Sequence, residues 1–415
     1  MEKRKELLFL FMEKIPLERI EWLAECFHKI ETEENLNQKN STGFNEKDQI
    51  RFFLTGDALF SLIDKRYQES WLKLISKNNF QCYLDSEELS LLGLKFNRCE
   101  KYFPKKEISR NIPFGNLKIK KESEFWHTLI NATHAKNYGN QIGFLEFQGP
   151  YMSRTSVNAV KFLESAIDNN LNPKFFTYLD GVHIGHLGQR PSEFENIGKK
   201  LVYLNQKAKK NNLNFKMLSC SRCGTARGHI REPESQKYIQ SDDVIPNYMF
   251  CNLNRIIDEY EESNLILAPS WGSVQFFSDP VQKIPDKKIS KPSIIVFITH
   301  SPYGSEWTFG GLSFAMACAN HEIPTELVFI EDGAYCLPTK HKVTEENKIF
   351  NIQDIIMATS DMEFLNYYVF EDSLKMRNLD LANNLNNIIE KINNLGGMIL
   401  SRPDQSITHK RIIFY

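Results

Sequence analysis

The sequence predicts an α/β protein made of three tandem units, each a mostly parallel sheet flanked by helices. The first observation is a repeat, because an apolar run meets an acidic residue beside a glycine at Asp57, Asp180 and Asp332. A buried strand that stops at a tight turn has this pattern. The second observation is that another apolar run and a helix-like segment precede each copy. Strand, helix and strand in succession favour a parallel sheet.

The first unit is expected at residues 1–135. Its first strand is an apolar run at residues 7–12, and a helix then begins near Pro16. That helix places four apolar residues on one face, namely Ile20, Leu23, Phe27 and Ile30. The second strand is the run FFLT, which leads directly into the turn at Asp57.

The second and third units are expected at residues 140–270 and 291–415. In the second unit, a strand at residues 142–147 precedes a helix whose apolar face is Val157, Val160, Leu163 and Ile167. In the third unit, a strand at residues 294–299 precedes a helix of small residues at 312–320. Polar and proline-containing stretches separate the units and are typical of linkers.

Composition and charge narrow the range of functions and locations that we expect for this protein. The formal net charge is −1, which gives no electrostatic reason to expect direct nucleic-acid or membrane binding. Eight cysteines in 415 residues are too few for a disulfide scaffold and fit a reducing compartment, so we expect a cytoplasmic protein. The apolar run near the start is shorter than a signal-peptide core, and no window has the roughly 18–20 apolar residues of a membrane span.

The segment CSRCGTARG, which starts at Cys220, is the main chemical signal. It follows an apolar run at residues 215–218, so its first cysteine lies where a strand ends and a turn begins. Backbone N–H groups at such a turn, together with Arg222, Arg227 and His229, are expected to favour a thiolate on Cys220. A thiolate in this position is a candidate nucleophile or sulfur carrier.

The same segment holds a second thiol, Cys223, at C-x-x-C spacing. Such a pair can close a disulfide and release sulfur, or protect the thiolate from over-oxidation. Other classes stay open. With His183 and His186 on a nearby loop, the two cysteines resemble a zinc ligand set, although the sequence has no second C-x-x-C. A thioredoxin-type dithiol that cycles between thiol and disulfide is another alternative, and a scaffold with incidental cysteines is a third.

The turn that starts at Asp180 and Gly181 is the candidate binding region. Loop tips at the carboxyl ends of parallel strands are where α/β proteins place ligands and reactive groups. His183 and His186 follow on the same loop, and either is able to assist proton transfer beside the cysteines. Turn chemistry alone also explains an Asp-Gly pair, so a purely structural role stays open.

With these motifs in hand, the chain resembles the DsrE-like sulfur relay family, and specifically the TusBCD and DsrEFH complexes. The first unit resembles TusB or DsrH through FFLTGDALFSLIDKRYQESW. The second resembles TusD or DsrE through the GPY turn, YLDGVHIG and CSRCGTARG. The third resembles TusC or DsrF through THSPYGSE, VFIEDGAYCLP and YYVFEDSLKMRNL.

The resemblance implies which residue carries sulfur. In that family the D-type subunit takes up sulfur as a persulfide on an essential cysteine. Cys220 matches it by its distance from the Arg-Gly pair, whereas Cys223 coincides with the cysteine of broader DsrE-like proteins. The equivalent points of the other units fall near Asp85 and at Phe370, so only the middle unit is expected to be chemically competent.

The resemblance also implies partners and assembly. A TusA-like protein would donate the sulfur and a TusE-like or DsrC-like protein would accept it, in tRNA 2-thiouridine synthesis or in sulfur oxidation. No metal or organic cofactor is implied, and tRNA would be met by a downstream enzyme. Family complexes pair two heterotrimers, and because one chain here corresponds to one trimer, a homodimer is expected.

Overall fold

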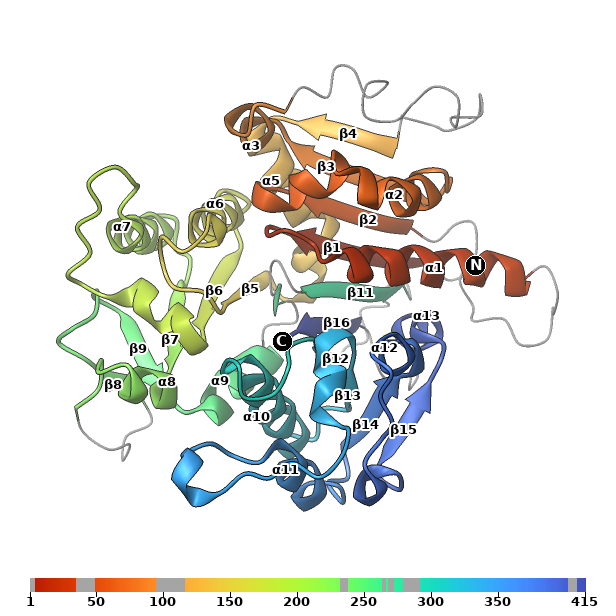
Figure 1. Cartoon of the computed structure of the whole chain (residues 1–415). Coiled ribbons are helices and arrows are strands. Elements are labelled where there is room, and N and C mark those ends of the chain that lie inside the picture. Colours follow the sequence, from red (N-terminus) through yellow and green to blue (C-terminus); the bar gives the residue numbers. More distant parts are fainter. Residues whose placement is uncertain are drawn as a thin grey trace, which may run out of the picture. The chain divides into compact units, whose positions relative to one another are not determined.

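The computed structural model describes residues 4–34, 49–94, 116–231, 238–262, 266–267, 272–278, 292–401 and 409–415. The chain divides into two compact units, of which the first is mainly Asn45–Val274 with Met1–Ala24 and the second is mainly Ile284–Tyr415. Three mostly parallel sheets flanked by helices are present, two in the first unit and one in the second (Figure 1). The predicted fold class is confirmed, whereas the boundaries of three domains stay a prediction.

The first sheet has the order β1-β2-β3-β4, and all its strand pairs are parallel. Its strands are β1 (Arg4–Phe11), β2 (Gln49–Leu54), β3 (Phe80–Asp85) and β4 (Leu117–Lys120). The helices are α1 (Leu17–Glu34), α2 (Gln68–Ile75), α3 (Ser86–Leu91) and α5 (Glu122–Ala132), with 3₁₀ segments η1 (Gly56–Leu62), η2 (Lys65–Tyr67) and η5 (Ala135–Tyr138). Its core is aromatic, because the Phe52 ring packs edge-on against Phe9, Phe80 and Trp71.

The second sheet has the order β10-β5-β6-β7-β9-β8, and only the β8–β9 pair is antiparallel among the strands described. Its strands are β5 (Gln141–Glu146), β6 (Asn172–Thr177), β7 (Lys216–Cys220), β8 (Ile239–Gln240), β9 (Tyr248–Cys251) and β10 (Ile266–Leu267). The helices are α6 (Thr155–Asp168), η6 (Leu179–Gly185), α7 (Ile197–Lys210), α8 (Ser221–Ala226) and α9 (Leu253–Glu262). A further strand, β11, is Gly272–Ser278.

The third sheet has the order β15-β14-β13-β12-β16, with parallel pairs throughout. Its strands are β12 (Ser293–Ile298), β13 (Thr325–Phe329), β14 (Leu365–Phe370), β15 (Ile389–Ile392) and β16 (His409–Phe414). The helices are α10 (Trp307–Asn320), η7 (Glu331–Cys336), η8 (Glu345–Asn347), α11 (Ile352–Ala358), α12 (Glu371–Met376), η9 (Asn383–Leu385) and α13 (Leu395–Leu400). The all-buried β12 explains the continuous apolar run in the sequence.

All three sheets share one turn after their second strand. An extended residue is followed by one in the left-handed region, and a 3₁₀ helix begins there. The left-handed residue is Gly56, Leu179 or Glu331, with φ of 54°, 53° and 52°. A glycine therefore supplies the unusual angle only in the first copy. In the other two copies, a non-glycine residue bears the strain.

Glycine is required in the second and third copies for a different reason. A Cβ on Gly181 would lie 2.3 Å from the carbonyl oxygen of Glu146, and one on Gly333 would lie 1.9 Å from that of Ile298. The 3₁₀ turn thus packs against the end of the neighbouring parallel strand, which is β5 for Gly181 and β12 for Gly333. The Asp-Gly signal in the sequence is a signature of this close approach.

In the first unit, α5 and α6 join the two sheets. The Trp126 and Phe162 rings pack edge to face at 6.5 Å. The Glu88 carboxylate is fully buried, and Arg154 donates to it through Nε at 2.8 and 3.0 Å and through Nη2 at 2.6 Å. A charged contact of this geometry fixes α6 against α3.

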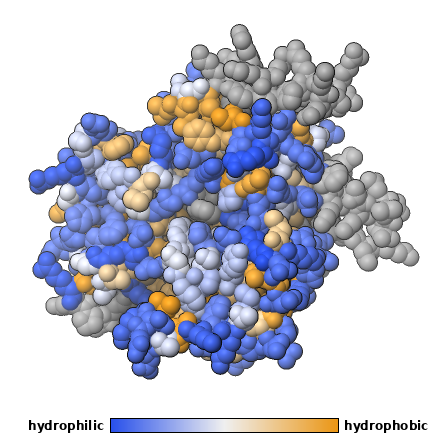
Figure 2. Space-filling model, in the orientation of Figure 1, coloured by the Kyte–Doolittle hydropathy of each residue, from blue (hydrophilic) through white to orange (hydrophobic). Residues whose placement is uncertain are grey.

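The surface is largely polar on the face shown in Figure 2, where apolar residues form separate small patches. Loops of the second sheet carry four of the exposed large apolar side chains, Tyr151, Met152, Leu187 and Phe194. Within the described ranges, no helix combines the length and the apolar character that crossing a bilayer requires.

Candidate functional site

Cys220 is the last residue of β7 and the N-cap of α8. The other sheets place Asp85 before α3 and Phe370 before α12 in the same way, and the backbone angles of all three caps are similar. The Asp85 side chain caps its helix by accepting from the N–H of Glu87 at 3.0 Å. The Phe370 ring makes no such cap bond, whereas the backbone N–H groups of Arg222 and Cys223 act on the Cys220 thiol.

Cys220 and Cys223, called the thiol pair below, are both buried, with exposed fractions of 2% and 7%. A hydrogen bond to Cys223, together with burial and the charge of an ionised Cys223, raises the pKa of Cys220 well above its ordinary value. The backbone N–H groups of Cys223 and Arg222 act in the opposite direction and are outweighed. The expected resting thiolate on Cys220 is therefore wrong, and the side chain of Arg222 is exposed at the surface.

Arg227, the second predicted helper, forms an ion pair with Asp180. Its Nε and Nη2 lie 2.8 and 2.7 Å from Oδ1 of the carboxylate. The third sheet repeats this pair, with Nε and Nη2 of Arg377 at 3.1 and 2.9 Å from Oδ1 of Asp332. Because Phe370 stands there in place of a cysteine, the ion pair ties the 3₁₀ turn to the short helix whether or not a thiol is present.

The predicted histidines belong to a hydrogen-bonded chain, which we call the His–Asp chain: His183, His186, His229 and Asp243. Nε2 of His186 lies 3.2 Å from one oxygen of Asp243, and Nδ1 of His229 lies 2.7 Å from the other. Nε2 of His229 is 3.0 Å from Nδ1 of His183. The His–Asp chain runs from two half-exposed side chains, His186 and Asp243, to the buried ring of His229.

Charge and burial set the protonation state of His183. Burial, followed by the nearby His229 and Arg227, lowers the pKa of His183, so its ring is neutral near pH 7. The sequence singled out His183 and His186, but it did not indicate Asp243. That residue lies 14 positions after His229, and no local motif links the two.

Below the thiol pair lies a buried hydroxyl network that sequence reasoning also missed. Oγ1 of Thr177 donates to Oγ of Ser219 at 2.9 Å, and the Tyr248 hydroxyl bonds to both. Burial raises the pKa of Tyr248 to about 12, so the phenol stays neutral. These bonds fix Ser219, the residue before Cys220, from the neighbouring strands.

Glu146 is a second residue that the sequence concealed. It ends β5, is 3% exposed, and accepts the N–H groups of Phe147 and Gln148 at 3.1 and 3.0 Å. Burial, with a smaller contribution from Glu13, raises the pKa of Glu146 to about 8. The available signal was an acid within the apolar run GFLEF, immediately before a Gly-Pro turn.

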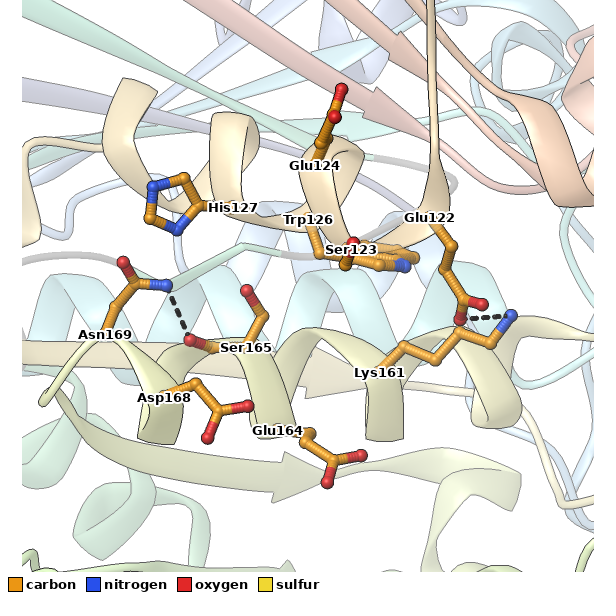
Figure 3. Close-up of a pocket in the computed structure, with 10 residues that line it drawn as sticks. All are labelled: Glu122, Ser123, Glu124, Trp126, His127, Lys161, Glu164, Ser165, Asp168 and Asn169. Carbon is orange, nitrogen blue, oxygen red and sulfur yellow. Dashed lines mark hydrogen bonds and ion pairs between the residues drawn. The ribbon is translucent and has the colours of Figure 1, made fainter.

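A groove of about 530 Å³ lies between α5 and α6, and Figure 3 shows its lining. None of the predicted site residues lines it. Its acidic side chains have lysine partners, since Glu122 lies 2.7 Å from Lys161 and Asp168 lies 2.7 Å from Lys207. The groove is therefore a charged surface feature that is separate from the thiol pair.

The residues of the zinc alternative fall into two hydrogen-bonded sets, because the thiol pair bonds internally while both histidines belong to the His–Asp chain. In the parts of the chain that the structure describes, no group of three or more His, Cys, Asp or Glu side chains is arranged to hold a metal ion.

Comparison with known proteins gives one family match, over part of the chain. Residues 293–401 match the model of the DsrE/DsrF-like family. The crystal structure of the YchN protein from E. coli is similar at 21% sequence identity, covering 31% of this chain and 97% of that one, with a TM-score of 0.25. No curated protein matches the chain. The family generally consists of sulfur relay proteins, which supports a sulfur-transfer role in coarse terms. The matched residues contain β12 to α13, so the similarity lies in the third sheet and its helices.

Proposed function

We propose that the chain is a sulfurtransferase that accepts persulfide sulfur on Cys220 and passes it to an acceptor protein. The observation that carries the proposal is the position of the thiol pair. Of the three matching strand ends, only that of β7 bears a cysteine, and the backbone N–H groups of Arg222 and Cys223 favour the ionised form of its thiol. A helix N-terminus favours negative charge, so the same point suits a sulfur anion once a base has removed the proton.

The proposed transfer is a sulfane exchange. The Cys220 thiolate attacks the terminal sulfur of a donor cysteine persulfide, and a new sulfur–sulfur bond forms as the donor bond breaks. The donor leaves as a thiolate, and the proton on the terminal sulfur travels with it to Cys220. No external oxidant or reductant is consumed, because one persulfide is exchanged for another.

Cys223 supplies a second outcome for the bound sulfur. Its thiolate can attack Sγ of the Cys220 persulfide, which closes a disulfide between the two cysteines and releases hydrosulfide. The hydrogen bond between the two thiols places them close enough to compete in this way. Passing sulfur to an acceptor and losing it as hydrosulfide are therefore alternative fates at one site.

The finer features of the proposal rest on the resemblance to TusBCD and DsrEFH. We assign a TusA-like donor and a TusE-like or DsrC-like acceptor, a homodimer, and a cytoplasmic location. Asp180, Gly181 and the His–Asp chain form the edge at which a partner would present its sulfur. The pathway, tRNA thiolation or sulfur oxidation, follows from the partner rather than from this site.

The test is intact-mass spectrometry after incubation with a cysteine desulfurase, cysteine and a small sulfur-carrier protein. A reducible gain of one sulfur on the peptide with the thiol pair is expected, and Cys220→Ser should abolish it. Cys336→Ser is the matched control, because that cysteine is buried in the turn of the third sheet and should load no sulfur.

The outcomes separate the alternatives. Loading that survives Cys220→Ser but is lost in Cys223→Ser would move the carrier role to Cys223. No loading, together with stoichiometric zinc in the purified protein, would replace the sulfurtransferase by a metal site. No loading, with reversible closure of a Cys220–Cys223 disulfide, would favour a dithiol redox protein.

A further inference from the structure

The thiol pair requires a base. Cys220 is held protonated at rest, and the guanidinium of Arg227 is bound to Asp180. A thiol is a poor nucleophile until it ionises. A group that accepts the proton must therefore lie beside α8.

Two helical faces meet at the Arg227–Asp180 ion pair. On α8, Cys223 lies four residues before Arg227, and residues four apart share a face of an α-helix. On η6, His183 lies three residues after Asp180, and residues three apart align in a 3₁₀ helix. The ion pair, with 2.7 Å between Nη2 and Oδ1, therefore joins the face of η6 that carries His183 to the face of α8 that carries Cys223. In agreement, the charge of Arg227 is one of the causes that lower the pKa of His183.

Hydrogen bonding assigns the tautomers of the His–Asp chain. Nδ1 of His186 accepts the N–H of Gly188 at 2.9 Å, so its Nε2 carries the hydrogen that bonds to Asp243. Nδ1 of His229 donates to the other oxygen of Asp243, which leaves its Nε2 to accept from Nδ1 of His183. The neutral ring of His183 then carries its lone pair on Nε2.

We propose that Nε2 of His183 accepts the first proton lost by the thiol pair and that the His–Asp chain is its proton relay. As the thiol gives its proton to Nε2, the Nδ1 proton of His183 passes to Nε2 of His229. The imidazolium of His229 is stabilised by the Asp243 carboxylate, and the half-exposed His186 links that carboxylate to solvent. The charged and titratable groups that shift the pKa of His183 are His229, Arg227 and His186, which lower it, and Asp180, which raises it. The role of the relay in sulfur transfer rests on the proposed function, but the proton transfer from the thiol pair does not.

The test measures thiolate formation without any sulfur donor. The full chain reacts with iodoacetamide at a series of pH values, and peptide mapping follows alkylation of the thiol pair. His183→Ala should lower the rate near neutral pH by about tenfold, which corresponds to a rise of about one pKa unit in the pair. Asp243→Asn should lower the alkylation rate severalfold. Added imidazole should restore part of the rate to His183→Ala. The rates of all variants and of the wild type should converge at high pH. His127→Ala, in the separate α5–α6 groove, should react like the wild type.

The relay would be overturned if His183→Ala and Asp243→Asn both reacted within about twofold of the wild-type rate at every pH. If the circular dichroism spectrum showed that His183→Ala does not fold, the alkylation rate of Asp243→Asn would decide. That variant should fold, because the Asp243 carboxylate is half exposed. Persulfide loading is measured in parallel. Slow alkylation in the variants with no loading in the wild type would support the relay and refute the proposed function. Normal loading in the wild type with unchanged alkylation in the variants would support the proposed function and refute the relay.

Discussion

Replacing Glu146 by glutamine is expected to stabilise the chain near neutral pH. Burial raises the pKa of Glu146 from 4.5 to about 8, so the folded chain holds a proton that the unfolded chain has released. Glutamine is neutral at every pH. Its amide oxygen is able to accept the same N–H groups, those of Phe147 and Gln148, at the end of β5.

The magnitude follows from linkage between protonation and folding. Because the folded pKa is raised, the stability that protonated Glu146 contributes is fully present below pH 4.5 and is lost as the pH rises towards 8. One pKa unit corresponds to about 1.4 kcal/mol, so the wild type should lose about 3 kcal/mol between about pH 5 and about pH 7.5 through this group. Glu146→Gln has no such loss. Its advantage over the wild type should therefore grow by the same amount across that range.

The assay is urea unfolding of both proteins across the pH range, with hydrogen exchange of the β5 peptide as a local readout. Glu124→Gln is the matched control, because its carboxylate is on α5 and half exposed, with only a long ion pair to Lys120 at 3.8 Å. A stability difference between Glu146→Gln and the wild type that does not change with pH would refute the reasoning. It would mean that the carboxyl is ionised in the folded chain.

Two further substitutions test the packing of the first unit. Arg154→Ala leaves the buried Glu88 carboxylate without its bidentate partner and should lower the free energy of unfolding by roughly 3 kcal/mol; Arg154→Lys should lower it less, and urea unfolding at wild-type stability for both would contradict the prediction. Gly181→Ala places a Cβ against the Glu146 carbonyl and should lower the free energy of unfolding by roughly 1–3 kcal/mol. Gly149→Ala, whose Cβ would have its nearest neighbour at 3.6 Å, should melt like the wild type, and equal melting temperatures for the two variants would contradict the expected clash.

The strands were predictable because both faces of a parallel sheet are buried, which leaves continuous apolar runs such as β12. The positions of the turns were predictable, but the residues that adopt the unusual backbone angles were not. The sequence shows an acidic residue beside glycine, yet the strained backbone falls on Leu179 and Glu331, one residue before the acid. Backbone angles of this kind depend on the carbonyl that the glycine approaches, and that contact is tertiary.

The candidate site was predictable where one segment carries it and hidden where it is assembled from several. The thiol pair and Arg227 share nine residues of sequence, so their proximity needed no fold. Asp243 joins His186 to His229 only because the chain after β8 pairs with the segment that follows η6, through the bridge between His186 and Val244. The ionisation state of Cys220 was mistaken for a similar reason, since Arg227 and His229 have carboxylate partners in the fold and the thiol is buried beside Cys223.

The three matching strand ends show how one backbone position can serve different purposes. A helix begins directly after each, so each side chain lies where N–H groups point outward and an acceptor is favoured. Asp85 uses that position to cap α3, and burial raises the pKa of Asp85, which keeps it a structural group inside the first unit. Phe370 is 8% exposed and fills the position with a ring. Of the three, Cys220 alone has a side chain that can gain and lose a sulfur atom. Chemistry at this point is therefore compatible with a rigid scaffold, and Cys220→Ser should remove sulfur loading while leaving the fold intact.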